Sequence, residues 1–387
     1  MKENIISKFK EVFGDGGDIR TYFAPGRVNL IGEYTDFNGG HVFPCALTIG
    51  TYAAARKNND GKLRFYSMNF EELGVIENSI DDLAFKKEDD WANYPKGIIK
   101  VMLNEGYGID SGFDVVYNGN IPNSSGLSSS ASIEVLTCFI LTDLFGLDVD
   151  FVKNALIGQK AENEYVGVNC GIMDQFAIAM GKENAAVFLD TATLDYTYVP
   201  VTLGDAKIVI MNTNKKRGLN DSKYNERRAE CEEALADLQT KLDIKTLGDL
   251  DEKTFDANQM LVKNPVARRR AKHAVYENQR TIKAVDYLKA GDLKAFGGLL
   301  NESHISLRDD FEVTGKELDT LASAAWHQEG VLGARMTGAG FGGCGVAIVK
   351  TANVEAFIKN VGDIYRKEIG YDAAFYVVEV GNGPSRI

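Results

Sequence analysis

The stretch IPNSSGLSSSASIE, residues 121–134, has the composition of a phosphate-binding loop. Pro122 interrupts an extended segment, Gly126 permits a tight turn, and Ser128 to Ser132 supply hydroxyls and unobstructed backbone amides. The run IEVLTCFILTDLF that follows has the apolar spacing of a buried helix. Because the first amides of a helix have no intrachain acceptor and carry partial positive charge, we expect a phosphate there, with serine hydroxyls available to a magnesium ion. The alternative is a flexible linker, which the long apolar helix disfavours.

A second group of polar side chains lies in APGRVNLIGEYTDFNGGH, residues 24–41. One cation, Arg27, and two acids, Glu33 and Asp36, stand among glycines and asparagines. Ligands with many hydroxyls are held in this way, because each carboxylate oxygen accepts a hydroxyl proton in a fixed direction. The alternative is a turn-rich hairpin whose charged side chains face water.

A third candidate is an acid in apolar surroundings. In AENEYVGVNCGIMDQFAIAMG, residues 161–181, Glu162 is expected on a helix that the GVNCG segment interrupts. Asp174 follows, flanked by Met173 and Phe176. A buried carboxylate is costly without partners, so Asp174 is a candidate for the functional site. The alternative is an aspartate that caps a helix.

The run MTGAGFGGCGVAIV, residues 336–349, contains Gly338, Gly340 and Gly343 in the GxGxxG spacing of dinucleotide-binding proteins. A strand-like VAIVK follows where that motif needs a helix, so we reject a dinucleotide site. The glycines instead predict a loop whose backbone approaches a ligand or another loop closely. No GxxxxGK[ST] occurs in the chain, which excludes a P-loop kinase.

The elements that position these groups follow from hydrophobic periodicity and turn residues. The sequence predicts helices over 1–14, 91–106, 130–146, 222–242, 264–291 and 354–370, and strand-like runs over 51–57, 112–120, 185–201, 207–214, 344–350 and 373–380. Near residue 200 the composition shifts from strands and turns to long charged helices. We therefore expect an α+β protein of two lobes, 1–200 and 201–387, with its ligands in the cleft between them.

Composition narrows the classes of partner. The 387 residues have a net charge of −12, which argues against nucleic acid and anionic membranes. The five cysteines are scattered without a CxxC pair, and the four histidines form no HExxH motif, so neither disulfides nor a zinc site are expected. The N-terminal helix does not have the pattern of a signal peptide, and no apolar run reaches bilayer length. These features favour a cytoplasmic protein without a membrane partner.

Taken together, GRVNLIGEYTDFNGG, GLSSSAS with GIMDQ, and GARMTGAGFGGC resemble the motifs of galactokinases, within the GHMP superfamily of small-molecule kinases. The likeness extends over nearly the whole chain and includes FYSMNF, NYPKG and DSKYNERR. It implies a two-lobed GHMP-kinase-like fold with mixed and antiparallel sheets, and an active site between the lobes. It also implies ATP as co-substrate, Mg²⁺ as cofactor and galactose as substrate.

The resemblance assigns a role to each matching residue. Asp174 is similar to the catalytic acid that faces the anomeric hydroxyl, and Arg27 to its cationic partner, which would keep Asp174 ionised and stabilise the transferring phosphoryl group. Whether the acid removes the proton or orients the hydroxyl stays open, because such transition states tend to be loose. Ser130 and Glu162 match magnesium ligands. The positions that match sugar contacts are Glu33, Tyr34, Thr35, Asp36, Gly171 and Tyr224. The positions that match nucleotide contacts are Ser67, Trp91, Tyr94, Ser124, Ser125, Gly126, Leu127, Ser128, Ser129 and Ser130.

One departure concerns the sugar motif. The family pattern reads GEHTDY, whereas this chain reads GEYTDF, with Tyr34 in place of histidine and Phe37 in place of tyrosine. The phenol of Tyr34 is expected to reshape the pocket beside the distal sugar hydroxyls. Loss of the hydroxyl at Phe37 removes a hydrogen bond worth about 1 kcal/mol. Both changes bear on sugar preference more than on phosphoryl transfer.

The implied activity is phosphorylation of D-galactose at its anomeric hydroxyl to galactose 1-phosphate, the first committed step of Leloir galactose catabolism. A sugar 1-kinase for N-acetylgalactosamine or a galactose analogue is an alternative that Tyr34 keeps open. A non-catalytic galactose sensor is disfavoured, because the serine loop, Asp174 and Arg27 are all present. A monomer or weak homo-oligomer is expected.

Overall fold

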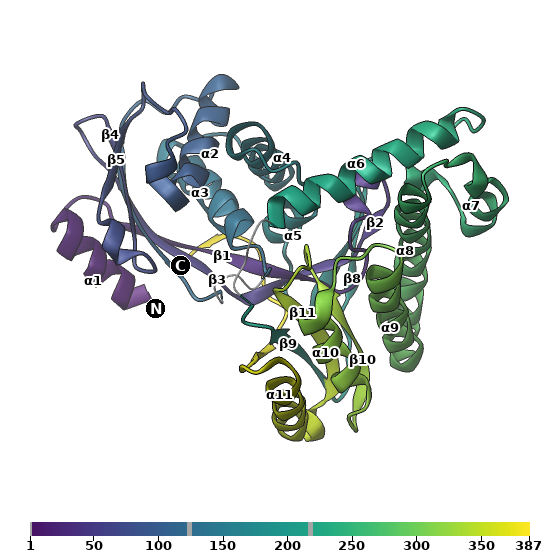
Figure 1. Cartoon of the computed structure of the whole chain (residues 1–387). Coiled ribbons are helices and arrows are strands. Elements are labelled where there is room, and N and C mark those ends of the chain that lie inside the picture. The colour runs from purple at the N-terminus through teal and green to yellow at the C-terminus, as the bar shows by residue number, and fades with distance from the viewer. Residues whose placement is uncertain (1, 122–125, 216–219) are drawn as a thin grey trace.

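The computed structural model describes residues 2–121, 126–215 and 220–387, without the side chains of 220–222 (Figure 1). Its helices are α1 (Lys2–Phe13), α2 (Asn93–Asn104), α3 (Ser129–Phe145), α4 (Phe151–Ala161), α5 (Met173–Ala179), α6 (Asn220–Gln239), α7 (Glu252–Asn258), α8 (Pro265–Ala290), α9 (Leu293–Asp309), α10 (Gly315–Trp326) and α11 (Val354–Ile369). Its strands are β1 (Arg20–Asn29), β2 (His41–Val42), β3 (Pro44–Lys57), β4 (Lys62–Ser67), β5 (Ile76–Ser79), β6 (Phe113–Gly119), β7 (Ala185–Asp190), β8 (Tyr196–Pro200), β9 (Ala206–Asn212), β10 (Val331–Thr337), β11 (Cys344–Lys350), β12 (Ala374–Val378) and β13 (Ser385–Arg386).

The N-terminal half is built on a six-stranded sheet in the order β13-β1-β3-β6-β4-β5. Its neighbouring strands are antiparallel except for the parallel pair β4 and β6. Side chains of a strand alternate between faces. In β3, Ala53 and Ala55 therefore face the core formed with α2 to α5, whereas Ala54 faces α1 on the opposite side. Both faces of this sheet are covered by helices.

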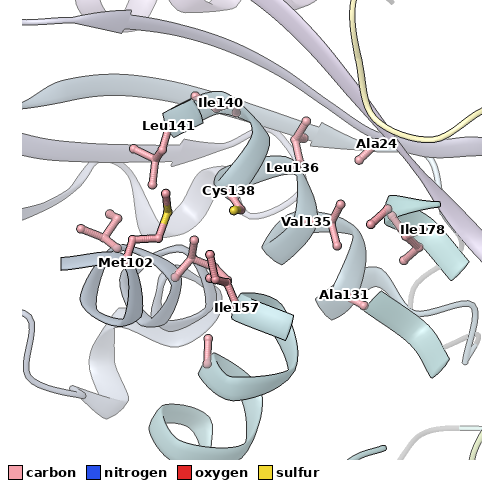
Figure 2. Packing of buried hydrophobic residues seen from close by; sticks show 14 of the residues in the cluster. Ala24, Met102, Ala131, Val135, Leu136, Cys138, Ile140, Leu141, Ile157 and Ile178 are labelled. Carbon is pink, nitrogen blue, oxygen red and sulfur yellow. The ribbon is translucent and has the colours of Figure 1, made fainter. Parts of the chain in front are cut away.

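Helix α3, which carries the serine loop, is surrounded by other elements. Figure 2 shows its side chains packed against Met102 of α2, Ile157 of α4 and Ile178 of α5. Val135 and Leu141 are fully buried, and each buried aliphatic side chain contributes about 1.5–3 kcal/mol. This packing holds the N-terminal end of α3 at a fixed place relative to β1.

The C-terminal half contains a four-stranded antiparallel sheet in the order β10-β11-β9-β12. One face packs on α10 and α11. On the other face, Ile210 and Val346 share a hydrophobic core with Val28 and Phe43 from the N-terminal half. The chain finally returns to the first sheet, where β13 pairs with β1 (Figure 1). The two halves thus share a core and a sheet, and the lobe boundary at 1–200 and 201–387 stays a prediction.

A third, smaller sheet in the order β2-β7-β8 lies close to a helical region in which α8 runs beside α6 and α9 (Figure 1). The core of this region includes Cys231 of α6, Ala271 of α8 and Leu307 of α9. It also includes Tyr34 from the first motif. The long charged helices therefore brace the segment that follows β1.

The predicted helices and strands are confirmed, as is an α+β fold. The segment 185–201 forms two strands, β7 and β8, joined by a turn. The dinucleotide fingerprint is correctly rejected, because residues 338–343 form the turn of a hairpin between β10 and β11. Among the described residues, no helix has the length and apolar character needed to cross a membrane.

Helices α4, α5, α7, α9 and α10 lie outside the predicted ranges, as do strands β1, β2, β4, β5, β10 and β13. In α9 the adjacent glycines Gly297 and Gly298 have the look of a turn, yet both are helical. Close packing explains Gly297, because a Cβ there would lie 2.0 Å from the carbonyl oxygen of Leu332 on β10. A Cβ on Gly298 would meet nothing within 4 Å. Packing against β10 therefore stabilises this helix although two glycines lower its intrinsic helix propensity.

These two glycines give a matched test of the α9–β10 contact. We expect Gly297→Ala to lower the free energy of unfolding by about 2 kcal/mol or more, because backbone faces the new methyl group. Gly298→Ala is expected to be neutral or to stabilise by up to about 1 kcal/mol, because alanine favours the helix. Urea unfolding of both variants measures the difference. Equal stability of the two variants would contradict the packing described.

Candidate active site

The three motifs converge on one cavity of ≈ 540 Å³. Its wall includes Arg27 and Asp36 from the first motif, Ser128 from the serine loop, Asp174 from α5, and Gly338 from the glycine loop. A second cavity of ≈ 430 Å³ adjoins it, since both are lined by Phe70, Ser129 and Ser130. The two cavities therefore adjoin at the N-terminal end of α3.

The Arg27–Asp174 ion pair forms part of the wall of the first cavity. Nε of Arg27 donates to Oδ1 of Asp174 and Nη2 donates to Oδ2, both at 2.9 Å, which is the two-pronged geometry typical of arginine and carboxylate. Arg27 is 3% exposed, whereas the Asp174 side chain keeps 30% of its surface open. The buried guanidinium of Arg27 therefore holds the Asp174 carboxylate with one edge open to the cavity.

Local backbone features set this pair in place. Strand β1 has a register shift between Pro25 and Arg27, which turns Arg27 toward α5. The backbone N–H of Arg27 donates to the carbonyl oxygen of Leu127 at 3.3 Å, and its Nη1 donates to that of Gly126 at 2.7 Å. One arginine thus ties the sugar motif to the serine loop.

The described part of the serine loop begins at Gly126. Ser128 has a left-handed φ of 59°, and its hydroxyl donates to Oδ2 of Asp174. Ser129 and Ser130 form the first turn of α3, where free amides and the helix dipole favour an anion. Ser124 and Ser125 lie outside the described residues, so their predicted phosphate contacts stay predictions.

A chain of buried polar groups lies behind the first turn of α3. The Gln175 side-chain amide donates from Nε2 to Oε2 of Glu162 at 2.6 Å and to Oε2 of Glu134 at 2.9 Å. Burial and the charge of Asp174 raise the pKa of Glu162 to about 7. Burial and the charge of Glu162 raise the pKa of Glu134 well above its usual range. Glu134, Glu162 and Asp174 therefore form a group of acids with few cations to balance their charge.

Such a site is suited to a divalent cation. Ser130 forms a side-chain hydrogen bond with Glu162, so a hydroxyl and a carboxylate, both hard oxygen donors, meet beside the helix end. In the described part of the chain, no group of three or more His, Cys, Asp or Glu residues could hold a metal alone. Mg²⁺ usually keeps few protein ligands and takes the rest from phosphates and water, so these residues fit the ion.

The candidate sugar contacts Glu33, Asp36 and Gly171 also line the first cavity. Glu33 is held by the Asn29 side-chain amide at 2.6 Å and by the Gly338 backbone N–H at 2.7 Å. Asp36 lies against Gly171, where a Cβ would sit 1.9 Å from its Oδ2 atom. Burial and the charge of Asp174 raise the pKa of Asp36 to about 6. A glycine at 171 is therefore required beside this carboxylate.

Tyr34 lies in an aromatic cluster at the edge of the cavity. Its ring centroid is 4.5 Å from that of Phe311 and 5.4 Å from that of Tyr224, and its hydroxyl donates to the carbonyl oxygen of Ala339. The phenol thus bonds to the glycine loop. Both Tyr34 and Tyr224 line the cavity, whereas Phe37 lies beneath the guanidinium of Arg228, 5.6 Å from its ring.

The second cavity brings together the predicted nucleotide contacts Ser67, Trp91 and Tyr94. Its largely apolar wall suits a flat heteroaromatic ring. Trp91 stands edge-on to Tyr117, with ring centroids 5.8 Å apart. Thr35 and Leu127, by contrast, are fully buried and lie outside the described walls of both cavities. The Thr35 hydroxyl donates to the carbonyl oxygens of Gly32 and His41 and so stabilises the turn.

The sequence assigned no role to Glu134, Gln175 or Phe70. Glu134 carries a usable signal, since a charge interrupts an otherwise apolar helix there. Gln175 follows Asp174 directly, but its position between two acids depends on three helical segments that the sequence does not place relative to one another. Phe70 lines both cavities and is the last residue of FYSMNF, a segment from which the likeness assigned a role to Ser67 alone.

The raised pKa of Asp36 leads to a stability prediction. A carboxyl whose pKa is raised on folding stabilises the protein fully below its unfolded pKa of 3.8, and that stability is lost as the pH rises through about 6. Asp36→Asn is therefore expected to stabilise the ligand-free protein at pH 8 by about 1–2 kcal/mol and to change little at pH 4. Unfolding at the two pH values measures this difference.

Asp143 provides the control of opposite sign. Although burial opposes it, hydrogen bonds from Tyr22 and Arg20 lower the pKa of Asp143. Its contribution is therefore present above its unfolded pKa and is lost as the pH falls. Asp143→Asn should destabilise the protein at pH 8. If Asp36→Asn did the same, the electrostatic description of the sugar contacts would be wrong.

Three family models match successive parts of the chain. The galactokinase galactose-binding signature matches residues 7–57, the N-terminal domain of GHMP kinases matches 93–182, and the C-terminal GHMP kinase model matches 284–367. The signature includes Arg27 and Asp36, and the N-terminal domain includes Asp174. The two members of the ion pair thus come from different family domains of the chain.

The likeness to curated relatives spans the full chain. The galactokinases of Ligilactobacillus salivarius and Streptococcus mutans are each 59% identical over 382 residues, which cover 99% of this chain and 98% of the relative. The crystal structure of Lactococcus lactis galactokinase complexed with galactose is similar at a TM-score of 0.98 and 53% identity, covering 100% of both chains. Methanococcus jannaschii mevalonate kinase, at 16% identity and a TM-score of 0.66 over 95% of this chain and 99% of its own, shares the fold. The chain therefore belongs to the galactokinase family, within the GHMP kinases.

Proposed function

We propose that this protein transfers the γ-phosphoryl group of ATP to the anomeric hydroxyl of D-galactose and releases galactose 1-phosphate and ADP. The observation that carries the proposal is the position of the Arg27–Asp174 pair. Glu33 and Asp36, acids suited to sugar hydroxyls, line the same cavity as this pair, and so do Ser129 and Ser130 from the first turn of α3. A sugar hydroxyl and a terminal phosphate would therefore meet at this pair.

Asp174 would act on the attacking hydroxyl. Its exposed carboxylate edge can accept the anomeric O–H as a hydrogen bond, which orients the oxygen toward the phosphorus atom. As the new O–P bond forms and the bond to the ADP oxygen breaks, the hydroxyl proton leaves toward Asp174. Arg27 would balance the negative charge around the transferring group from its buried position.

The adenine and phosphates would occupy the second cavity. Trp91 and Tyr94 would flank the base, Ser67 would contact the nucleotide, and the amides of Ser129 and Ser130 would hold the phosphates. Ser130 and Glu162 would ligate Mg²⁺, which supplies charge neutralisation of the phosphates when bound. The predicted contacts of Ser124 and Ser125 belong to the same proposal.

Two coarser proposals concern the protein's surroundings. No disulfide joins the described cysteines, of which Cys45, Cys138, Cys231 and Cys344 are buried. We propose a reducing cytoplasm on this ground, and a monomeric or weakly associating state as a separate expectation. Size-exclusion chromatography with light scattering tests the association state.

The activity is tested by ADP release from MgATP with galactose, N-acetylgalactosamine, galactosamine, glucose and talose, each checked for a sugar 1-phosphate by ³¹P NMR. We expect the highest turnover with galactose. Turnover with an analogue but not with galactose would replace the proposal by a sugar 1-kinase of altered specificity. Sugar binding without turnover on any of them would favour the sensor.

Position 34 gives a specificity prediction. Tyr34→His removes the bond to Ala339 and replaces a phenol by a smaller ring that can hydrogen-bond to a sugar hydroxyl. We expect the galactose KM to fall about three- to tenfold, the value of one hydrogen bond. Phe37→Tyr is the control, since Phe37 lies outside the described wall of the sugar cavity. An unchanged sugar profile in Tyr34→His would show that this position does not set specificity.

A further inference from the structure

A buried ionic network lies directly beneath the sugar motif. Its centre is Arg335, a fully buried residue of β10 whose side chain crosses to the first motif. Nη1 of Arg335 donates to the carbonyl oxygens of Asn29 and Leu30, both at 3.1 Å, and lies 3.4 Å from Oε1 of Glu33. A single guanidinium thus holds the end of β1 and the candidate sugar-binding carboxylate.

Glu277 of α8 is the second member of the network and is also fully buried. Its Oε1 atom accepts the backbone N–H of Gly32 at 3.0 Å and the hydroxyl of Ser303 at 2.6 Å. That hydroxyl in turn accepts Nε–H of Arg335 at 3.1 Å. Glu277 therefore contacts the residue just before Glu33 and is joined through Ser303 to the arginine that contacts Glu33.

Charge balance explains why the network needs its cations. Although burial opposes it, the charge of Arg280 and neighbouring groups lowers the pKa of Glu277 to about 2. Glu33 and Glu277 place two carboxylates in a dry interior, where an uncompensated charge is costly. Arg280 donates to Oε2 of Glu277 at 2.8 Å, which leaves Arg335 as the cation beside Glu33 among the described residues.

Glu33 has little freedom within this network. Oε2 accepts Asn29, and Oε1 accepts Gly338 and faces Arg335, so the plane of its carboxyl group is fixed by partners from β1 and the glycine loop. A sugar hydroxyl that meets Glu33 then meets an acceptor in one defined direction. Loss of the guanidinium would remove the cation beside Oε1 and the two hydrogen bonds to the carbonyl oxygens of Asn29 and Leu30, which loosens both the carboxylate and the backbone that continues from Arg27.

We propose that Arg335 is a positioning residue for sugar binding, which orients Glu33 through Nη1 of its guanidinium and is itself held by Ser303 and Glu277. The proposal rests on the proposed function, in which Glu33 binds the sugar. A positioning role predicts that substitution of Arg335 weakens sugar binding. A purely structural arginine would alter the melting temperature and leave sugar affinity unchanged.

Arg335→Lys tests the positioning role, because lysine keeps the positive charge but loses the planar guanidinium that bonds to several partners at once. Arg270→Lys is the matched control, since Arg270 is 2% exposed and bonds to Glu230, Glu312 and the carbonyl oxygen of Asp310, each at 2.7 Å, none of which belongs to the sugar motif. We expect both variants to melt at lower temperature. Arg335→Lys alone should raise the galactose KM at least tenfold, with the ATP KM within twofold of wild type. A galactose KM within twofold of wild type in Arg335→Lys would overturn the proposal.

A double variant with Glu33 measures whether the two residues act together on galactose binding, independently of any loss of stability. If Arg335 acts through Glu33, the double variant Glu33→Gln/Arg335→Lys should bind galactose no more weakly than Glu33→Gln alone in calorimetric titration. Additive losses would contradict action through Glu33. Should Arg335→Lys fail to fold, Ser303→Ala removes one bond to Arg335, and we expect a two- to fivefold rise in the galactose dissociation constant; no rise would overturn the proposal.

Measurements on the wild-type protein separate the proposed function from the positioning role of Arg335. If wild type does not phosphorylate galactose, the proposed function fails, and the same variants are titrated with whichever sugar of the panel wild type binds. A selective loss of that sugar's affinity in Arg335→Lys would still support positioning. Equal affinities in wild type and Arg335→Lys would refute it.

Discussion

The arrangement of the active site depends on one ion pair. Arg27 is buried on β1 and Asp174 is partly exposed on α5, and they meet through two parallel hydrogen bonds. Removing one partner of such a pair leaves the other charge uncompensated in a dry setting, so the two elements are bound to one relative position. Arg27 also bonds to Gly126, and Asp174 to Ser128. The serine loop, the first motif and Asp174 are consequently placed by the same contact.

Around this pair lie acidic side chains whose negative charge is not fully balanced by cations. Asp36 and Glu162 have raised pKa values of about 6 and 7, because both are buried near Asp174. Ligands would relieve this repulsion: sugar hydroxyls by donating to Asp36, and a cation by binding at Glu162. The acidic surface of the chain is thus compatible with a phosphorylated co-substrate, since amides, an arginine and a metal would supply the positive potential locally.

Much of this could be predicted from the sequence. The helices at 91–106, 130–146 and 264–291 have strong periodicity, and the motifs around Arg27, Asp174 and Gly338 converge as the family likeness implies. Contacts between distant segments could not be predicted. Helix α9 was hidden by Gly297, whose lack of a side chain serves packing against β10. The sequence alone does not show that Thr35 bonds within its own turn, or that Gln175 lies between two acids.

The role of Asp174 is tested most directly by Asp174→Asn, with galactose binding measured by calorimetric titration and ADP release measured on the same preparation. Asparagine keeps an oxygen for Arg27 but is neither a proton acceptor nor an anion. We expect galactose binding close to that of wild type and turnover reduced at least about 10³-fold, within the range expected for loss of a general base. Turnover within about tenfold of wild type would remove Asp174 from the chemistry.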